Sequence, residues 1–500
     1  MVCAIAYYPN INIKLNILAG FRKVGITPHE IFNTGFNLKT HVLYTVDASY
    51  HYLCVDLKME FPSGFIQQIQ NASGFDEGPF LLAHETPAPV SIRLNPNKKT
   101  NMQHGENVPW CSNAYYLPVR PAFVFDPLFH AGAYYVQEAS SMFTGYLFST
   151  YADKTKSLKI LDLCAAPGGK STLIAGLMNE HSLLVSNEVI KSRARILKEN
   201  IDKWGNPNVV VSNNDPRDFS ALTNFFDVII IDAPCSGSGL FRKEPDAKNE
   251  WSEENVLHCS KRQSRILEDV IPALKQNGLL IYATCSYSEA ENEQIVMQLI
   301  TKGFQPLLNK KLPSDFGNIV TNEYGYRFYP DKIKGEGFFV SILQKTESDN
   351  QDEQAFNKKT EPLTTSETAI ISPYLKAPEE LFFYKHKNII YCIPEVIKPA
   401  VMALGILYLI KSGIAIGEIK HNELIPDHEL ALSTLIGENI PRVELDEPTA
   451  IAYLRKNTIQ IDTEIKGWCL VTYQQLPLGW IKVIPGRINN YYPVELRIRK

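Results

Sequence analysis

Apolar runs alternate with helical stretches between Leu158 and Ile300. The runs read LKILDLCA, LLVSNEV, VVVSNND, FDVIIIDAP and GLLIYATCS. This alternation predicts an α/β domain built on a doubly wound, mostly parallel sheet. Ligands bind such sheets outside the carboxyl ends of the strands, so we expect the residues at those ends to carry any chemistry.

Local sequence signals indicate where the helices of this region start and end. One helix is expected from Lys170, and another is expected to close near Gly205. The helix after the fourth run is expected to begin at Trp251 and to stop at Gly278. After the fifth run, SEAE at 288–291 has the pattern of a capping box. These boundaries leave DAPCSGSG and TCSYS in loops.

The segments on either side of this region have different patterns. Residues 1–58 show neither a helical nor a strand period, and they end just before Met59, which we expect to be the native start. SIRLN within 89–98 has a strand-like pattern and predicts a small α/β module. The expected parts are an unassigned extension (1–58), an N-terminal module (59–130), the α/β domain (131–344), a polar linker (345–369) and a strand-rich C-terminal domain (370–500).

Length and composition bound the class of protein. A chain of 500 residues is too long for one hydrophobic core, which agrees with several folded parts. The net charge of -4 neither supports nor excludes a nucleic-acid partner, so an RNA-binding surface has to be a local basic face. The chain lacks a signal-peptide pattern and an apolar run of about 18 residues, so we expect a cytoplasmic protein with no membrane partner.

The sequence CAAPGGKS at 164–171 follows the first run and opens a helix. Gly169, Lys170 and Ser171 match the end of a phosphate-binding loop, but Cys164 replaces its first glycine, which argues against an ATPase. A glycine turn before a helix lets the backbone approach a ligand, and the helix start favours a carboxylate such as that of S-adenosylmethionine. Taken alone, the turn is equally well explained as a tight connection.

Two acidic residues end the next two runs. Glu188 lies about 20 positions after the glycine turn, where an acid can accept hydrogen bonds from both ribose hydroxyls of an adenosyl group. Asp215 ends the third run, and by itself it could be a solvated surface acid. Three strand ends in series, carrying the glycine turn and two acids, favour S-adenosylmethionine as the cofactor.

The nine cysteines include no CxxC pair and no cluster with zinc spacing, so neither a disulfide scaffold nor a metal site is expected. Cys235 and Cys285 follow the fourth and fifth runs, where both should face the carboxyl edge of the sheet and could attack a bound substrate. Free cysteines are usually small core residues, and this is our interpretation of six of the other seven, Cys3, Cys54, Cys111, Cys259, Cys392 and Cys469.

A cysteine at this position suits methylation of cytosine, because carbon 5 of cytosine is a poor nucleophile. Addition of a thiolate to carbon 6 gives an enamine-like intermediate whose carbon 5 accepts a sulfonium methyl group. Asp232 could stabilise charge developing at N3, and Cys235 could assist loss of the C5 proton. An ordinary thiol has a pKa of about 8.5, so the site needs local positive charge, for which Lys170 is the first candidate.

The motifs DAPCSGSG and TCSYS resemble those of the Nop/Sun family of RNA cytosine-C5 methyltransferases, and CAAPGGK is similar to its cofactor motif. The resemblance implies a Rossmann-like class I methyltransferase core with Cys285 as the nucleophile and Cys235 as the release residue. It implies that Asp232 contacts the base and the cofactor, and that Lys170 places a positive charge on the substrate side. The implied cofactor pocket consists of Cys164, Ala165, Ala166, Pro167, Gly168, Gly169, Lys170, Glu188, Asp215 and Asp232.

Three further segments are similar to the RsmF-like bacterial branch: DPLFHAGAYYVQEASSM at 126–142, RFYPDKIKGEGFF at 327–339, and the C-terminal part. This branch acts on small-subunit ribosomal RNA, and the similarity implies an RNA-contacting N-terminal module and a PUA-like RNA-binding C-terminal domain. Basic residues of the tail could bind phosphates, and its aromatic residues could stack on bases or pack a small barrel, with packing favoured for at least half. These residues are Lys482, Arg487, Arg497, Arg499 and Lys500, with Trp480, Tyr491 and Tyr492.

We therefore expect a monomeric enzyme that methylates carbon 5 of a cytosine in 16S ribosomal RNA through a covalent adduct at carbon 6. Methyltransferases of tRNA or DNA cytosine share this chemistry, and the DNA class carries its nucleophile in a Pro-Cys motif, which would make Cys235 the attacker. An RNA-binding ribosome-assembly factor without catalysis is the non-enzymatic alternative. Cysteines at both strand ends favour RNA methylation, and the complete set of site residues disfavours loss of catalysis.

Overall fold

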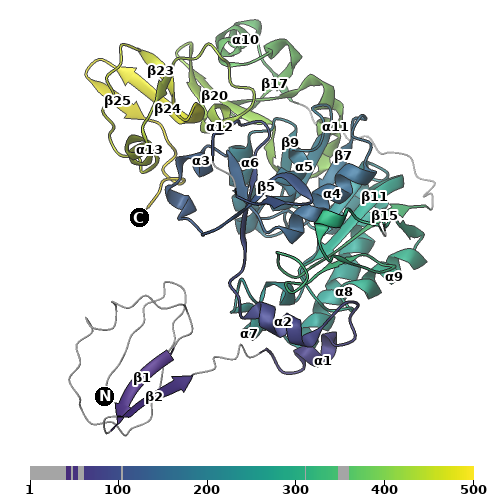
Figure 1. Ribbon diagram of the computed structural model, residues 1–500. Helices are drawn as coiled ribbons and strands as arrows, with labels where there is room; N and C mark the ends of the chain where they lie inside the picture. Colours follow the sequence, from purple (N-terminus) through teal and green to yellow (C-terminus); the bar gives the residue numbers. More distant parts are fainter. Residues whose placement is uncertain are drawn as a thin grey trace. The chain divides into compact units, whose positions relative to one another are not determined.

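The computed structural model describes residues 41–46, 49–54, 61–102, 105–309, 311–346 and 360–499 (Figure 1). The chain consists of two units, Met1–Glu60 and Phe61–Lys500. In the first unit, β1 (His41–Val46) pairs with β2 (Ser49–Cys54) as an antiparallel hairpin, which the sequence pattern does not predict. The expected native start at Met59 lies outside the described residues.

The second unit begins with two helices and a small sheet. The helices are α1 (Phe65–Ile69) and α2 (Glu77–His84), and their Phe65 and Phe80 pack with Phe241 and Trp251 in one apolar cluster. The strands are all antiparallel, in the order β4 (Asn107–Val108), β5 (Cys111–Leu117), β3 (Val90–Leu94) and β6 (Tyr134–Val136). The strand β3 confirms the interpretation of SIRLN, and the short helix α3 (Pro127–His130) precedes β6.

The central sheet has ten strands within the described residues. In order across the sheet they are β13 (Val320–Thr321), β14 (Tyr326–Phe328), β15 (Phe338–Lys345), β11 (Leu274–Thr284), β10 (Phe226–Asp232), β7 (Lys159–Asp162), β8 (Leu183–Asn187), β9 (Val209–Ser212) and β19 (Leu409–Ser412), and β12 (Phe304–Pro306) pairs with β15. The strands β11, β10, β7, β8 and β9 are parallel and coincide with the five apolar runs, which confirms the predicted doubly wound sheet. Antiparallel strands flank this parallel core on both sides.

Helices cover both faces of the sheet because successive strand residues point to opposite faces. Ile160 of β7 packs with α4 (Phe143–Tyr151), α5 (Gly169–Ala175) and α6 (Lys191–Trp204). Its neighbour Leu161 packs on the other side with α8 (Glu253–Val270), α9 (Glu293–Thr301) and α11 (Lys398–Ala403). Gly205, in the left-handed conformation, ends α6 as predicted. The helix α7 (Ala247–Glu250) precedes α8.

Two helix boundaries predicted from the sequence are wrong. The helix α8 ends at Val270 rather than at Gly278, because Pro272 has no backbone N–H to continue the helical hydrogen bonds, a 3-10 turn follows at Ile271–Ala273, and Leu274 already begins β11. The helix α9 begins at Glu293 with Asn292 as its cap, so SEAE at 288–291 is not a capping box. The carboxylate of Glu291 is bound by two loops of the sheet edge instead.

The C-terminal part contains two further sheets. The first has the order β16 (Glu361–Pro362), β17 (Leu381–His386), β18 (Ile389–Pro394), β20 (Ile414–Lys420) and β21 (Glu423–Pro426), and the second β22 (Arg442–Glu444), β23 (Gly467–Tyr473), β24 (Leu476–Ile484) and β25 (Arg487–Asn490). The helices α12 (His428–Leu432) and α13 (Glu447–Leu454) pack with them. Trp480 and Tyr492 are buried and Tyr491 is exposed, so packing accounts for two of the three aromatic residues named in the tail.

The segment predicted as a polar linker, 345–369, contains secondary structure within its described residues. Its described C-terminal end contains β16 and the start of α10 (Thr365–Ile371), which a capping box between Thr364 and Glu367 opens. Further along, β19 belongs to the expected C-terminal domain but pairs with β9 of the central sheet, so the two expected domains share one sheet. Among the described helices, none has both the length and the apolar composition of a transmembrane segment.

Candidate active site

The two cysteine loops leave the sheet side by side. Asp232 at the end of β10 lies opposite Ala283 near the end of β11, so the following residues emerge at the same edge. The Sγ atoms of Cys235 and Cys285 are 3.1 Å apart, which confirms that the two thiols meet at this edge. The backbone N–H of Gly239 also donates to the carbonyl of Cys285. The structure therefore brings together the two cysteines that the sequence singled out.

The environment of Cys235 favours its protonated form. The pKa of Cys235 is raised well above its usual value, first by its hydrogen bond to Cys285 and then by burial. Both causes favour the protonated form, because a donated S–H and a low-dielectric surrounding disfavour the thiolate.

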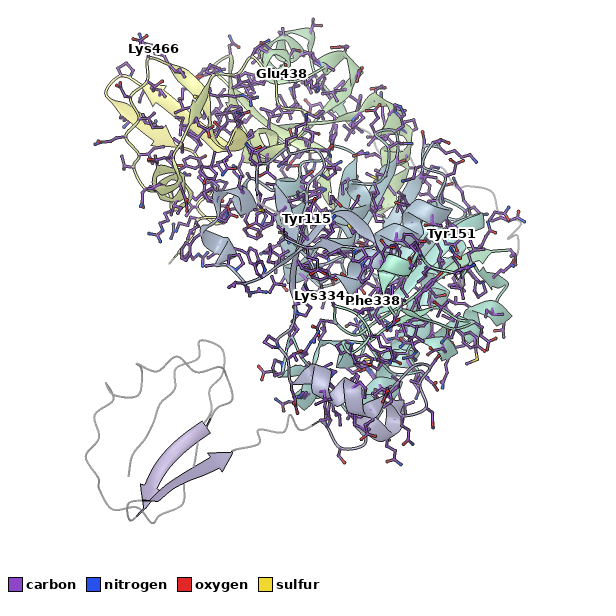
Figure 2. The ribbon with its side chains drawn as sticks, in the orientation of Figure 1. Tyr115, Tyr151, Lys334, Phe338, Glu438 and Lys466 are labelled. Carbon is purple, nitrogen blue, oxygen red and sulfur yellow. The ribbon has the colours of Figure 1, made fainter. Side chains whose placement is uncertain are left out.

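Lys170 supplies a buried positive charge beside the cysteines. Its Nζ lies 2.7 Å from Oδ2 of Asp232, and it lies over the ring of Phe338, labelled in Figure 2, at 5.1 Å from the centroid. Burial alone lowers the pKa of Lys170, but the charge and hydrogen bond of Asp232, with smaller contributions that include Cys285, raise it above its usual value. The ammonium group therefore stays protonated, as the chemistry of an activated thiol requires.

The glycine turn has a fixed backbone. Gly168 has a φ of 117°, a conformation that side chains rarely adopt, and a Cβ atom there would lie 3.3 Å from Cδ1 of Leu197. The carbonyl of Ala166 accepts a hydrogen bond from Arg193 at 2.8 Å. On the other side, Arg93 of β3 donates to the carbonyl of Gly169 and to the hydroxyl of Thr172. The turn from Cys164 to Lys170 is thus held in place from two neighbouring elements.

The acids predicted at the next two strand ends have different environments. Glu188 is buried, accepts a hydrogen bond from the N–H of Ile190 and lies 3.3 Å from the guanidinium of Arg193. Asp215 is partly exposed and caps the 3-10 helix that follows it by accepting from the N–H of Arg217. These contacts fix the orientation of both acids, and the capping contact gives Asp215 a structural role that the sequence reading did not foresee.

A third acid was missed by the sequence reading. Asp162 is fully buried at the end of β7; its Oδ2 accepts from the hydroxyl of Ser171 at 2.6 Å, and its Oδ1 has no hydrogen-bond partner among the described residues. Burial, opposed mainly by the bond from Ser171, raises its pKa to about 7. A signal was present in the sequence, because a carboxylate inside the apolar run LKILDLCA is expensive to bury unless it is used.

The unpartnered oxygen of Asp162 offers a test of the predicted cofactor. A buried acceptor without a donor is stabilised by a ligand that brings a cationic N–H group, which the ammonium of S-adenosylmethionine has. The buried carboxylate of Glu188 lies at the end of the neighbouring strand β8. The residues present therefore fit this cofactor. In the described part of the chain, no group of three or more His, Cys, Asp or Glu side chains has the arrangement of a metal site.

Comparisons with known proteins agree with this geometry. Three family models match: the N-terminal domain of 16S rRNA methyltransferase RsmF at 61–139, 16S rRNA methyltransferase RsmB/F at 150–344, and the methyltransferase RsmF PUA domain at 440–498. The crystal structure of PH0851 is similar with 25% identity and a TM-score of 0.51, over 58% of this chain and 67% of that one.

Two curated relatives extend the similarity over nearly their whole length. Ribosomal RNA small subunit methyltransferase F of Vibrio vulnificus (strain YJ016) is 30% identical over 467 residues, which cover 87% of this chain and 97% of the relative. The enzyme of the same name from Salmonella arizonae is 30% identical over 469 residues, with coverage of 87% and 96%. The chain therefore belongs to the ribosomal RNA small subunit methyltransferase F family.

Proposed function

We propose that this protein methylates carbon 5 of a cytosine in 16S ribosomal RNA, with S-adenosylmethionine as the methyl donor. The observation that carries the proposal is the pair of thiols of Cys235 and Cys285, 3.1 Å apart, beside the ion pair of Lys170 and Asp232. Covalent methylation of a cytosine carbon needs a nucleophile for attack and a base for release, and the two thiols can take these two roles. Membership of the ribosomal RNA small subunit methyltransferase F family indicates which class of RNA is the substrate.

In the proposed mechanism, Cys285 is the nucleophile. Its sulfur forms a bond to carbon 6 of the cytosine, and the electron pair of the 5,6 double bond makes carbon 5 nucleophilic. S-adenosylmethionine supplies the methyl group as an electrophilic sulfonium methyl. Asp232 holds the N3/N4 edge of the base and shares a proton with N3, which stabilises the charge that develops there, while Lys170 orients Asp232 and places a positive charge near Cys285.

Release is assigned to Cys235. Once the sulfur of Cys285 is bonded to carbon 6, it no longer accepts the hydrogen bond that is the largest cause of the raised pKa of Cys235. The pKa of Cys235 then falls, Cys235 gives its proton to solvent, and its thiolate removes the proton from carbon 5. The electron pair of that C–H bond re-forms the double bond, and Cys285 departs as a thiolate. The same two thiols thus act in turn.

We also propose where the cofactor and the RNA bind. The cofactor pocket consists of Cys164, Ala165, Ala166, Pro167, Gly168, Gly169, Lys170, Glu188, Asp215 and Asp232, to which the unpartnered oxygen of Asp162 is added. The N-terminal module at 59–130 contacts RNA, the catalytic domain spans 131–344, and the PUA-like part within 370–500 binds RNA through its basic residues. A cytoplasmic monomer that acts on the small ribosomal subunit or a precursor of it is sufficient for this function.

The test is a methyl-transfer assay with labelled S-adenosylmethionine and small subunits or 16S RNA that lack the modification, followed by nucleoside analysis. Wild type should form 5-methylcytidine and Cys285→Ala should form none. Cys235→Ala should accumulate a covalent protein–RNA adduct, because attack proceeds and release does not. Cys259→Ala, at a buried cysteine in α8, is the matched control and should be active.

Other outcomes would overturn particular parts of the proposal. If Cys285→Ala stays active while Cys235→Ala is dead, the two roles are reversed, as in the DNA class. Product on transfer RNA or DNA but not on 16S RNA would replace the substrate. If no nucleic acid is methylated while ribosomal RNA is bound, the protein is an assembly factor.

A further inference from the structure

Glu291 joins the two catalytic loops. It is fully buried at 0% exposure, in the segment between the Cys285 loop and α9. Its Oε1 accepts from the backbone N–H of Ser236 at 2.8 Å, and its Oε2 accepts from the hydroxyls of Ser236 at 2.6 Å and Ser286 at 2.5 Å. Ser236 and Ser286 directly follow Cys235 and Cys285. One carboxylate therefore links the residues next to both thiols.

The elements around this link hold it rigidly. Gln263 of α8 donates to Oε1 of Glu291 and to the carbonyl of Pro234 in the first cysteine loop. Asn292 donates to the carbonyl of Ser286 at 2.8 Å and accepts from the hydroxyl of Thr284 at 2.5 Å. The hydroxyl of Tyr282 donates to the carbonyl of Glu291 itself. Glu291 and its neighbour Asn292 are thus held by α8, which follows the first cysteine loop, and by β11, which precedes the second.

Stability alone does not account for a carboxylate at this place. Among the described residues, the groups that bind Glu291 are hydroxyls, a side-chain amide and a backbone N–H. Burial raises the pKa of Glu291, and these hydrogen bonds oppose the shift only in part. A buried carboxylate held without a paired cation is costly. The side chain of Glu291 is long enough for its two oxygens to contact both loops, which a shorter acceptor would not connect.

We propose that Glu291 is a positioning residue for methyl transfer, whose carboxylate spans the two loops and sets the separation of the two catalytic sulfurs. This inference rests on the proposed function, in which one sulfur attacks while the other assists release. A change of about 1 Å in such an arrangement can lower the rate about 100-fold. The effect should appear in the chemical steps, since Glu291 touches neither the glycine turn nor Glu188 in its hydrogen bonds.

The test separates the effect of side-chain length from that of charge with three variants, Glu291→Gln, Glu291→Asp and Glu291→Ala. Glutamine keeps the length and one acceptor, whereas aspartate keeps the charge but is shorter by about 1.5 Å. We expect kcat to fall about 100-fold in Glu291→Asp and Glu291→Ala, and less in Glu291→Gln. The KM for S-adenosylmethionine should stay within about threefold of wild type, because binding of the cofactor is unaffected. In the Cys235→Ala background, adduct formation should slow in the same order.

Two further variants keep the result interpretable. Glu429→Gln alters another buried carboxylate, one paired with Lys411 in the C-terminal part, and should leave kcat unchanged. If the Glu291 variants fail to fold, the double variant Ser236→Ala with Ser286→Ala removes both hydroxyl arms and should lower kcat at least about tenfold with unchanged KM.

Three outcomes would overturn the inference: an aspartate variant more active than the glutamine variant, a loss expressed in KM alone, or an unchanged kcat. An inactive wild type would instead refute the proposed function.

Discussion

At the scale of single residues, the sheet edge concentrates buried charge. Lys170 and Asp232 form an ion pair, while Asp162 lies nearby with one oxygen unpaired. An ion pair stabilises the charged forms of both partners, whereas burial without a full set of donors favours the neutral acid. The same edge therefore holds the carboxylate of Asp232, which is paired with Lys170, and that of Asp162, whose charge depends on pH and on what binds there.

The pH dependence of stability should reveal Asp162. Its pKa is about 7 in the folded protein against 3.8 for an ordinary Asp, so the folded state holds a proton that the unfolded chain has lost between these values. Its favourable contribution is complete below about pH 4 and is lost as the pH rises through about 7. The pKa of Asp162 is also affected by four neighbouring groups, which are Ser171, Lys170, Asp232 and Glu188.

Asp162→Asn should therefore become more stable relative to wild type as the pH rises from 5 to about 8. Urea unfolding of both proteins at the two pH values measures this difference. The assignment fails if the two proteins lose stability in parallel.

At the scale of elements, the N-terminal module helps to hold the glycine turn of the proposed cofactor site. Arg93 of β3 is buried, bonds to Gln137, and reaches the carbonyl of Gly169 and the hydroxyl of Thr172 at the start of α5. Its guanidinium also lies 4.7 Å from the ring centroid of Trp204, at the end of α6. One side chain from the small sheet thus connects two helices of the methyltransferase domain, which binds the two parts into one structural unit.

Arg93→Met should lower both stability and cofactor affinity, because four acceptor atoms lose their donor while the apolar length is kept. We expect the free energy of unfolding to fall by about 2–3 kcal/mol. Thermal unfolding and equilibrium dialysis with labelled S-adenosylmethionine measure the two effects. Arg265→Met, at an exposed position of α8, is the control and should change neither. Normal cofactor binding in a destabilised Arg93→Met would restrict Arg93 to a structural role.

At the scale of the second unit, the C-terminal part completes the catalytic domain. The strand β19 pairs antiparallel with β9, with Leu409 opposite Ser212. Leu404, just before it, packs in the same apolar cluster as Ile229 and Leu280 of the central sheet. Lys411 of β19 forms a buried ion pair with Asp202 of α6. The C-terminal part is thus an edge of the sheet and a cover for one of its faces.

Leu404→Ala should therefore destabilise the catalytic domain, by about 2–4 kcal/mol, in a single cooperative transition. Its control is Ile406→Ala in the same short helix, where the side chain is 37% exposed and should cost much less. Urea unfolding followed by far-ultraviolet circular dichroism, with and without S-adenosylmethionine, measures both. Two separate transitions, of which only one shifts, would show that the C-terminal part folds independently.

Much of the catalytic domain could be predicted because its signals are local. Five apolar runs gave the five parallel strands, and the position of Cys235 and Cys285 after two of them placed both thiols at one edge. The same approach failed where a side chain bonds to distant residues. The pattern SEAE suggested a capping box, but Glu291 lies 55 positions from the Ser236 that it binds. The roles assigned to Cys285, Cys235, Asp232, Glu188 and Asp215 stay predictions until the variants are measured.

The sequence by itself determined the order of strands and helices, the Rossmann-like class, the cysteine pair and the glycine turn, because periodicity and turn chemistry act over a few residues. Tertiary structure alone decided the rest. It joined β19 to β9 across about 200 positions, set Arg93 on the start of α5, left an oxygen of Asp162 without a partner and placed Glu291 between the two loops. The physical reason is that burial and hydrogen-bond partners depend on which surfaces meet in the folded chain, and no short window of sequence contains both surfaces.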